Sequence, residues 1–196
     1  MATRGAVGRA ALFLVPALAP VAAIDPAPDV QAQGGEPDPR EVARQIVLRQ
    51  LAAAPRSRAQ LGRKLAQRGC PADVAEAVLD RMTEVGLVDD GAYAQMLVRS
   101  QQAGRGLSRR ALAHELRTKG IAGDLAAEAV ASISDEDERE RARTLVSKKL
   151  RAMHGLGIEI QTRRLAGMLA RKGYPSSLSY AVIREALADA PEHLPD

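Results

Sequence analysis

The stretch SRAQLGRKLAQRGCPADV, residues 57–74, decides the fold because the same pattern recurs twice later in the chain. SRRALAHELRTKGIAGDL begins at Ser108, and QTRRLAGMLARKGYPSSL begins at Gln161. Aligned without gaps, the three segments share two leucines, a glycine and a further apolar residue in one register. A repeat with a period of about fifty residues predicts stacked helical units.

The first unit shows the pattern of three helices. Apolar residues at helical spacing predict a helix over 41–53, and Ser57 with Gln60 forms the capping box that starts a second helix. Gly69 ends this second helix because glycine tolerates the left-handed conformation after a C-cap. Residues 71–85 then carry the apolar spacing of a third helix.

The later units begin with signals of their own. Asp89 or Asp90 suits the N-cap of a helix that opens the second unit. Residues 135–152 predict a longer helix, whose acidic first turn and basic last turn match the helix dipole. An acidic run of this kind favours a solvated helix start over a metal site.

The composition favours an all-α fold. Alanine and leucine are abundant, whereas the chain has three tyrosines, one phenylalanine and no tryptophan. Residues of the first kind favour helices, and aromatic residues favour strands. We therefore predict three tandem three-helix repeats, at 41–88, 89–133 and 134–190, in an elongated body whose curvature the sequence leaves open, followed by a tail over 191–196.

Residues 1–40 differ from the repeats. Residues 25–40 are rich in proline, glycine and polar side chains, which predicts a disordered N-terminal extension. Residues 10–24 form an apolar stretch that resembles a secretory signal, but prolines interrupt it and it is too short for a membrane span. Export through this segment is the alternative to a cytoplasmic location.

The sequence offers no pattern of an active site or a metal centre. A single cysteine excludes an intramolecular disulfide framework and a zinc site made of several cysteines. The three histidines have no ligand spacing to one another, and no nucleophile-elbow, phosphate-loop or HExxH motif is present. We therefore predict a non-enzymatic protein without a cofactor.

The only cysteine, Cys70, follows a helix-ending glycine, as Ile121 and Tyr174 do in the later repeats. This is the C″ position of a Schellman cap, where an apolar residue often packs back on its helix. A small apolar role is favoured over a redox or nucleophilic one, because no histidine or second cysteine lies nearby to activate the thiol. The predicted packing pairs are Leu65 with Cys70, Leu116 with Ile121 and Leu169 with Tyr174.

Basic residues concentrate in the second helix of each repeat. The segments 56–69, 105–120 and 161–173 carry net charges of +5, +4 and +4. Such bands attract an acidic partner, either a nucleic acid or a protein, and the alternative is a set of solubilising charges. The candidate partner-binding residues are Arg58, Arg63, Lys64, Arg68, Arg109, Arg110, Arg117, Lys119, Arg163, Arg164, Arg171 and Lys172.

The segments SRAQLGRKLAQRG, VLDRMTEVGLVDDGAYA and SRRALAHELRTKG together resemble the RecX family of bacterial recombination regulators. The resemblance covers residues 41–131, extends more loosely over the third unit and does not include residues 1–40. It implies a cytoplasmic protein that lies in the groove of the RecA recombinase filament and inhibits its ATP hydrolysis, strand exchange and coprotease activity. Such a protein modulates recombination, DNA repair and the SOS response, and the family supplies no catalytic residues. We expect a monomer that does not associate with membranes.

Two other hypotheses stay open. One is a basic helical protein whose second helices contact DNA phosphates, which predicts salt-sensitive binding to naked DNA. The other is an exported helical interaction module, which requires cleavage after the first 24 residues.

Overall fold

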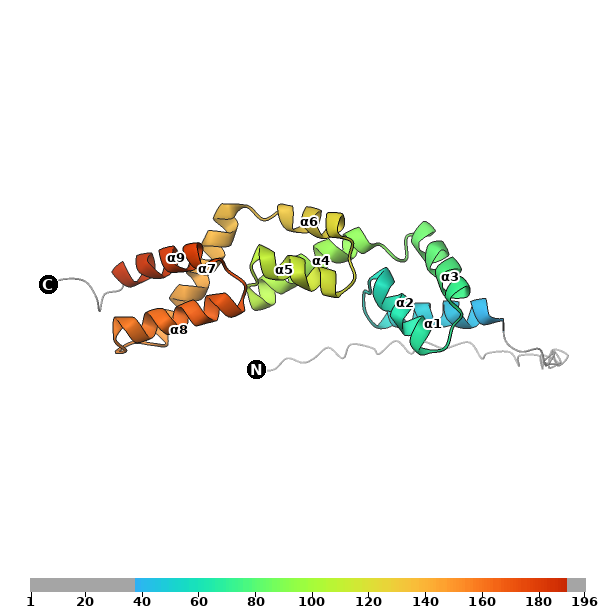
Figure 1. Ribbon diagram of the computed structural model, residues 1–196, viewed down its shortest axis with the longest axis horizontal. Helices are drawn as coiled ribbons and strands as arrows, with labels where there is room; N and C mark the ends of the chain where they lie inside the picture. The colour runs from blue at the N-terminus through green and yellow to red at the C-terminus, as the bar shows by residue number, and fades with distance from the viewer. Residues whose placement is uncertain (1–37, 190–196) are drawn as a thin grey trace, which may run out of the picture. The chain divides into compact units, whose positions relative to one another are not determined.

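The structure is a computed structural model that describes residues 38–189, and in this range it contains nine α-helices and no β-strand (Figure 1). The all-α fold of tandem three-helix units is confirmed. No helix in the described range is long and apolar enough to cross a membrane. The predictions for residues 1–37 and 190–196 lie outside the described residues. The helices are α1 (Pro39–Ala53), α2 (Arg58–Gln67), α3 (Ala72–Glu84), α4 (Asp90–Arg105), α5 (Arg109–Thr118), α6 (Gly123–Ala131), α7 (Asp135–Arg151), α8 (Ile158–Arg171) and α9 (Ser176–Ala188).

Helix starts follow the capping residues in the first two units. Ser57 and Gln60 form the predicted capping box of α2, in which the Ser57 backbone N–H donates to Gln60 Oε1 over 3.0 Å. Asp89 caps α4 by accepting from the Ala92 backbone N–H over 2.8 Å. The first helix begins two residues earlier than predicted, because Asp38 is its N-cap and Pro39 suits the first helical position.

The second helix of the third unit departs from the repeat pattern. The alignment places Gln161 at the position of the N-cap serines, whereas α8 begins at Ile158 after the N-cap Gly157. Gln161 is therefore inside the first turn of α8, fully buried, and its Nε2 donates to the Met153 carbonyl oxygen over 3.2 Å. Without a capping side chain at Gln161, the helix extends backward into residues 158–160.

Each unit buries its own hydrophobic core. The three clusters of buried residues draw on residues 43–88, 93–133 and 142–187, and none of them mixes residues of two units. The two leucines shared by the repeats form the centre of each core, since none of them is more than 1% exposed. These leucines are Leu61 and Leu65, Leu112 and Leu116, and Leu165 and Leu169.

All three second helices end in the predicted Schellman cap. Gly69, Gly120 and Gly173 have φ of 75°, 84° and 85°. The residue after each glycine donates its backbone N–H to the carbonyl oxygen of the second shared leucine, over 3.1 Å in every repeat. Each predicted packing pair, including Leu65 with Cys70, lies in one core cluster.

Two of these glycines also make the contact between neighbouring units. A Cβ atom on Gly120 would lie 2.3 Å from the Cβ of Ala59, and Ser57 Oγ donates to the Lys119 carbonyl oxygen over 2.7 Å. A Cβ atom on Gly173 would lie 2.7 Å from both Ser108 Oγ and the Cβ of Ala111. The end of one second helix therefore packs against the start of the second helix in the preceding unit.

The first glycine provides a matched test of this contact. Gly69 has a similar φ, but no atom lies within 4 Å of the position of a Cβ. We expect Gly69→Ala to cost about 1 kcal/mol of folding free energy from left-handed strain alone. Gly120→Ala adds the clash with Ala59, so its cost should rise to about 3 kcal/mol. Chemical denaturation of the two variants measures the difference, and equal losses would show that the contact does not constrain position 120.

Candidate partner-binding surface

The basic residues of the second helices fall into two groups. Arg58, Arg109 and Lys172 have side chains held by contacts within the protein. The other candidates make no side-chain hydrogen bond or ion pair with any described residue, so their charges face solvent or a partner. They are Arg63, Lys64, Arg68, Arg110, Arg117, Lys119, Arg163, Arg164 and Arg171.

The first residue of α2 is bound by the next unit. The Arg58 backbone N–H donates to Asp90 Oδ1 over 2.8 Å, and Asp90 is the first residue of α4. The Arg58 guanidinium forms an ion pair of 2.7 Å with Asp80 on α3. A carboxylate at this place accepts from an N–H that has no partner inside the helix, and its charge complements the positive end of the helix dipole.

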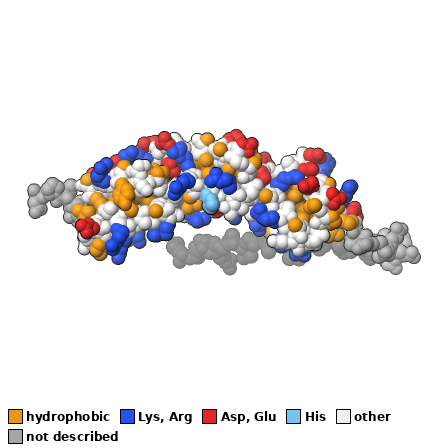
Figure 2. Space-filling view, viewed as in Figure 1, with side chains coloured by type: hydrophobic (Ala, Val, Ile, Leu, Met, Phe, Trp, Pro, Cys, Tyr) orange, Lys and Arg blue, Asp and Glu red, His pale blue; other side chains and the backbone are white. Residues whose placement is uncertain are grey.

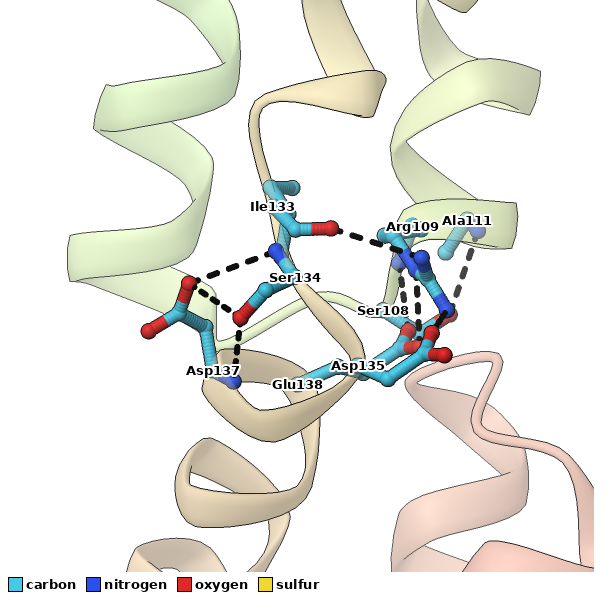
Figure 3. Close-up of polar contacts among 8 residues, drawn as sticks. All are labelled: Ser108, Arg109, Ala111, Ile133, Ser134, Asp135, Asp137 and Glu138. Carbon is cyan, nitrogen blue, oxygen red and sulfur yellow. Dashed lines mark hydrogen bonds and ion pairs between the residues drawn. The ribbon is translucent and has the colours of Figure 1, made fainter.

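The first residue of α5 repeats this arrangement with more contacts (Figure 3). The Arg109 backbone N–H donates to Glu138 Oε1 over 2.8 Å, and Arg109 Nε donates to Glu138 Oε2 over 3.0 Å. Arg109 also binds Asp135 and donates to the Ile133 carbonyl oxygen over 3.3 Å. The hydrogen bond to Asp135 raises the pKa of Arg109, because it stabilises the charged guanidinium.

Further polar contacts join the second and third units. The Ser108 backbone N–H donates to the Lys172 carbonyl oxygen over 3.0 Å, and Lys172 Nζ donates to the carbonyl oxygen of Arg105. The buried Tyr174 hydroxyl donates to the Gly106 carbonyl oxygen over 3.1 Å. The contact between the second and third units is therefore richer in hydrogen bonds than the one between the first and second.

The exposed basic residues lie on all three units. Arg110 and Arg117 are two helical turns apart on α5, and Arg164 and Arg171 are two turns apart on α8, so each pair shares a helix face. All four are exposed. Figure 2 shows Lys and Arg side chains in several separate groups along this view rather than in one continuous surface. Each unit thus offers its own small basic surface.

The sequence pattern missed the contacts that hold Arg58 and Arg109. The signal that could have found them is an acidic residue near the start of α4 and of α7, Asp90 and Glu138. We interpreted both acidic segments as helix starts only. Arg109 and Glu138 are 29 positions apart in the sequence, so no local spacing rule connects them.

Comparison with known proteins matches each unit to a separate domain of one family. Residues 43–82 match the first three-helix domain of RecX, residues 89–130 the second and residues 135–183 the third. The chain belongs to the RecX family. It is 52% identical to the regulatory protein RecX of Streptomyces coelicolor over 171 residues, which covers 85% of this chain and 91% of that protein. It is 49% identical to the regulatory protein RecX of Thermobifida fusca over 157 residues, or 79% of this chain and 85% of that protein.

Solved RecX structures share the fold. The crystal structure of RecX from Lactobacillus salivarius aligns with a TM-score of 0.69 at 20% sequence identity, covering 76% of this chain and 97% of that chain. A second crystal structure, of a regulatory protein RecX, aligns with a TM-score of 0.66 at 25% identity, covering 76% of this chain and 72% of that chain. At 20% identity, the Lactobacillus salivarius structure supports the helical fold alone.

Two adjacent arginines on α5 allow a structural role to be compared with an exposed charge. Arg109→Ala removes the side-chain partner of Glu138, a carboxylate that is 7% exposed, while the backbone N–H of residue 109 stays, and should cost about 2 kcal/mol of folding free energy. Arg110→Ala removes an exposed, unpaired charge and should change stability by less than about 0.5 kcal/mol. Urea denaturation of both variants tests this difference. A similar small effect for both would contradict a structural role for Arg109.

The burial of Tyr174 predicts that the protein loses stability at alkaline pH. Burial raises the pKa of Tyr174 from 10.0 to about 12. Because the folded pKa lies above the unfolded one, the neutral phenol stabilises the fold fully below about pH 10, and this stability is lost as the pH rises towards about 12. Tyr174→Phe should cost about 1 kcal/mol at neutral pH and lack this alkaline component. A titration followed by tyrosinate absorbance measures the pKa of Tyr174, and a phenol that titrates near pH 10 in the folded protein would contradict the prediction.

Proposed function

We propose that this protein is a non-enzymatic regulator that binds the RecA recombinase filament and inhibits its ATP hydrolysis, strand exchange and coprotease activity. The observation that carries the proposal is the complete set of three RecX domains in tandem within residues 43–183. The relatives named regulatory protein RecX, at about half identity over most of the chain, support it. Through the filament the protein would modulate recombination, DNA repair and the SOS response.

The division into units suggests how such a regulator works. Each unit has its own core and its own exposed basic residues, so each can make a separate weak contact with one filament protomer. Contacts on neighbouring protomers add through effective concentration, which favours a filament over free recombinase. A protein bound to several protomers opposes the independent movements that ATP hydrolysis and strand exchange require.

The proposed contact residues are the basic side chains without partners inside the protein. Arg110 and Arg117 represent them on the middle unit, where they are exposed on one face of α5. Arg58, Arg109 and Lys172 are less suited to this role, because a partner would have to compete with their existing contacts.

The function is tested by measuring DNA-dependent ATP hydrolysis by the cognate recombinase. We expect purified protein to suppress hydrolysis and strand exchange when it is substoichiometric to the recombinase, because one molecule contacts several protomers. Arg110→Ala with Arg117→Ala should raise the concentration needed for half inhibition by about tenfold.

The matched control is Lys148→Ala with Lys149→Ala on α7, which removes the same charge from two exposed residues outside the second helices. It should shift the inhibitory concentration by less than about threefold. Absence of inhibition at equimolar protein would contradict the proposed function, and equal effects of the two double variants would contradict the assignment of the contact surface.

The proposed location is the cytoplasm, where the recombinase acts, and the protein would work as a monomer. The apolar stretch at residues 10–24 is the reason to test this directly. Intact mass of the protein from its native cells decides between the locations. A product that lacks the first 24 residues would favour the exported interaction module instead.

A further inference from the structure

We propose that a cavity beside α2 binds the phosphate groups of a nucleic-acid backbone. The cavity has a volume of about 220 Å³ and lies in the first unit. Three cationic side chains and three amides line it, and no carboxylate does. The lining residues are Gln50, Arg56, Gln60, Leu61, Arg63, Lys64 and Gln67.

These groups are arranged along one side of α2. Arg56 precedes the N-cap Ser57, and Gln60, Lys64 and Gln67 follow on successive turns. At a rise of 1.5 Å per residue, the part of this row on α2, from Gln60 to Gln67, extends over roughly 10 Å, and Arg56 lies before the start of the helix. A single nucleic-acid strand carries about one charge per 3.4 Å, so a row of this length can meet more than one phosphate.

The donors in the cavity lack partners inside the protein. Arg56, Arg63 and Lys64 make no side-chain hydrogen bond or ion pair with any residue in the range 38–189, and Arg56 Nε is buried without a hydrogen-bond partner. A buried unpaired donor costs free energy, which an anionic oxygen at this place would recover. The capping box leaves Gln60 with an amide group to donate, because its Oε1 already accepts from Ser57.

The first unit alone has this set of groups among the described residues. At the positions of Arg56, Arg63 and Lys64 the second unit has Leu107, His114 and Glu115, and Glu115 forms an ion pair with Arg105. The corresponding residues of the third unit are Ile160, Gly167 and Met168. The cavity is therefore a local specialisation and not a by-product of the repeat.

A second cavity also has a buried arginine nitrogen without a partner, but its lining includes carboxylates. The cavity of about 470 Å³ beside α4, α6 and α7 is lined by Arg99 and Arg141, and Arg141 Nε is also buried without a partner. Glu128 and Asp137 line the same cavity and balance the two positive charges. Of these two cavities, the one beside α2 combines unpaired donors with a lining that contains no carboxylate.

The lining favours phosphate contacts over base contacts. No aromatic side chain lines the cavity, so bases have no surface on which to stack. Contacts confined to phosphates give binding that is independent of sequence and weakens with salt. This binding does not depend on the proposed action on the recombinase, and the assay that tests it contains no recombinase.

The experiment measures fluorescence anisotropy of a short labelled oligothymidine with the full-length protein over a series of salt concentrations. Arg56→Gln with Lys64→Gln should weaken binding at low salt by about tenfold and reduce the slope of log K against log salt by about 1. Lys148→Gln with Lys149→Gln removes the same charge elsewhere and should weaken binding by less than about threefold. Circular dichroism checks that both double variants stay folded, as expected for side chains without internal partners.

Two further ligands identify the source of the anion. Inorganic phosphate, added at constant ionic strength, should compete only weakly, because it lacks the neighbouring charges of a strand. A polyglutamate peptide should bind the wild-type protein and the cavity variant equally. No binding of the oligonucleotide, or equal losses in the two double variants, would overturn the proposal. Dependence of phosphate or polyglutamate binding on Arg56 and Lys64, with oligonucleotide binding unchanged, would also overturn it in favour of a free ion or an acidic protein.

Discussion

The close approach of Gly120 to Ala59, and of Gly173 to Ala111, is the constraint on which the arrangement of this protein depends. Each of the three cores is complete within its own unit, so the described units are connected by the chain and by contacts at their boundaries, of which these approaches between second helices are the tightest. Each of these two glycines has two effects. Its positive φ ends one helix in a Schellman cap, and the missing Cβ lets that helix end pack against the start of another.

The same contacts divide the basic residues by role. Where a second helix begins beside the next unit, a carboxylate from that unit binds the first backbone N–H, as Asp90 does for Arg58 and Glu138 for Arg109. The side chain of Arg58 then pairs with Asp80 on α3 of its own unit, and the side chain of Arg109 pairs with Glu138 on α7 of the next unit. Neighbouring residues such as Arg110 stay exposed. One positively charged helix therefore supplies both the internal contacts and the charge available to a partner.

Local patterns predicted most of the helices and none of the contacts between units. The capping box at Ser57 and the Schellman glycines are set by residues within five positions of one another, and a sequence shows them directly. The contact of Arg109 with Glu138 depends on how two units pack, which no spacing rule reports. The start of α8 also does not follow from the repeat, because the alignment places Gln161 beside the N-cap serines whereas the helix begins at Ile158. Arg56 was counted as charge but not as a candidate, because its cavity also needs Gln50 from α1.

Three units with separate cores and separate basic surfaces suit a partner that is itself repetitive. The central claim is that the units bind neighbouring protomers of a RecA filament together. The most direct measurement is the affinity of the protein for RecA assembled on single-stranded DNA of increasing length, compared with its affinity for free RecA. Affinity should rise steeply once the DNA is long enough to hold several protomers side by side. Equal affinity for free RecA and for long filaments would contradict the claim.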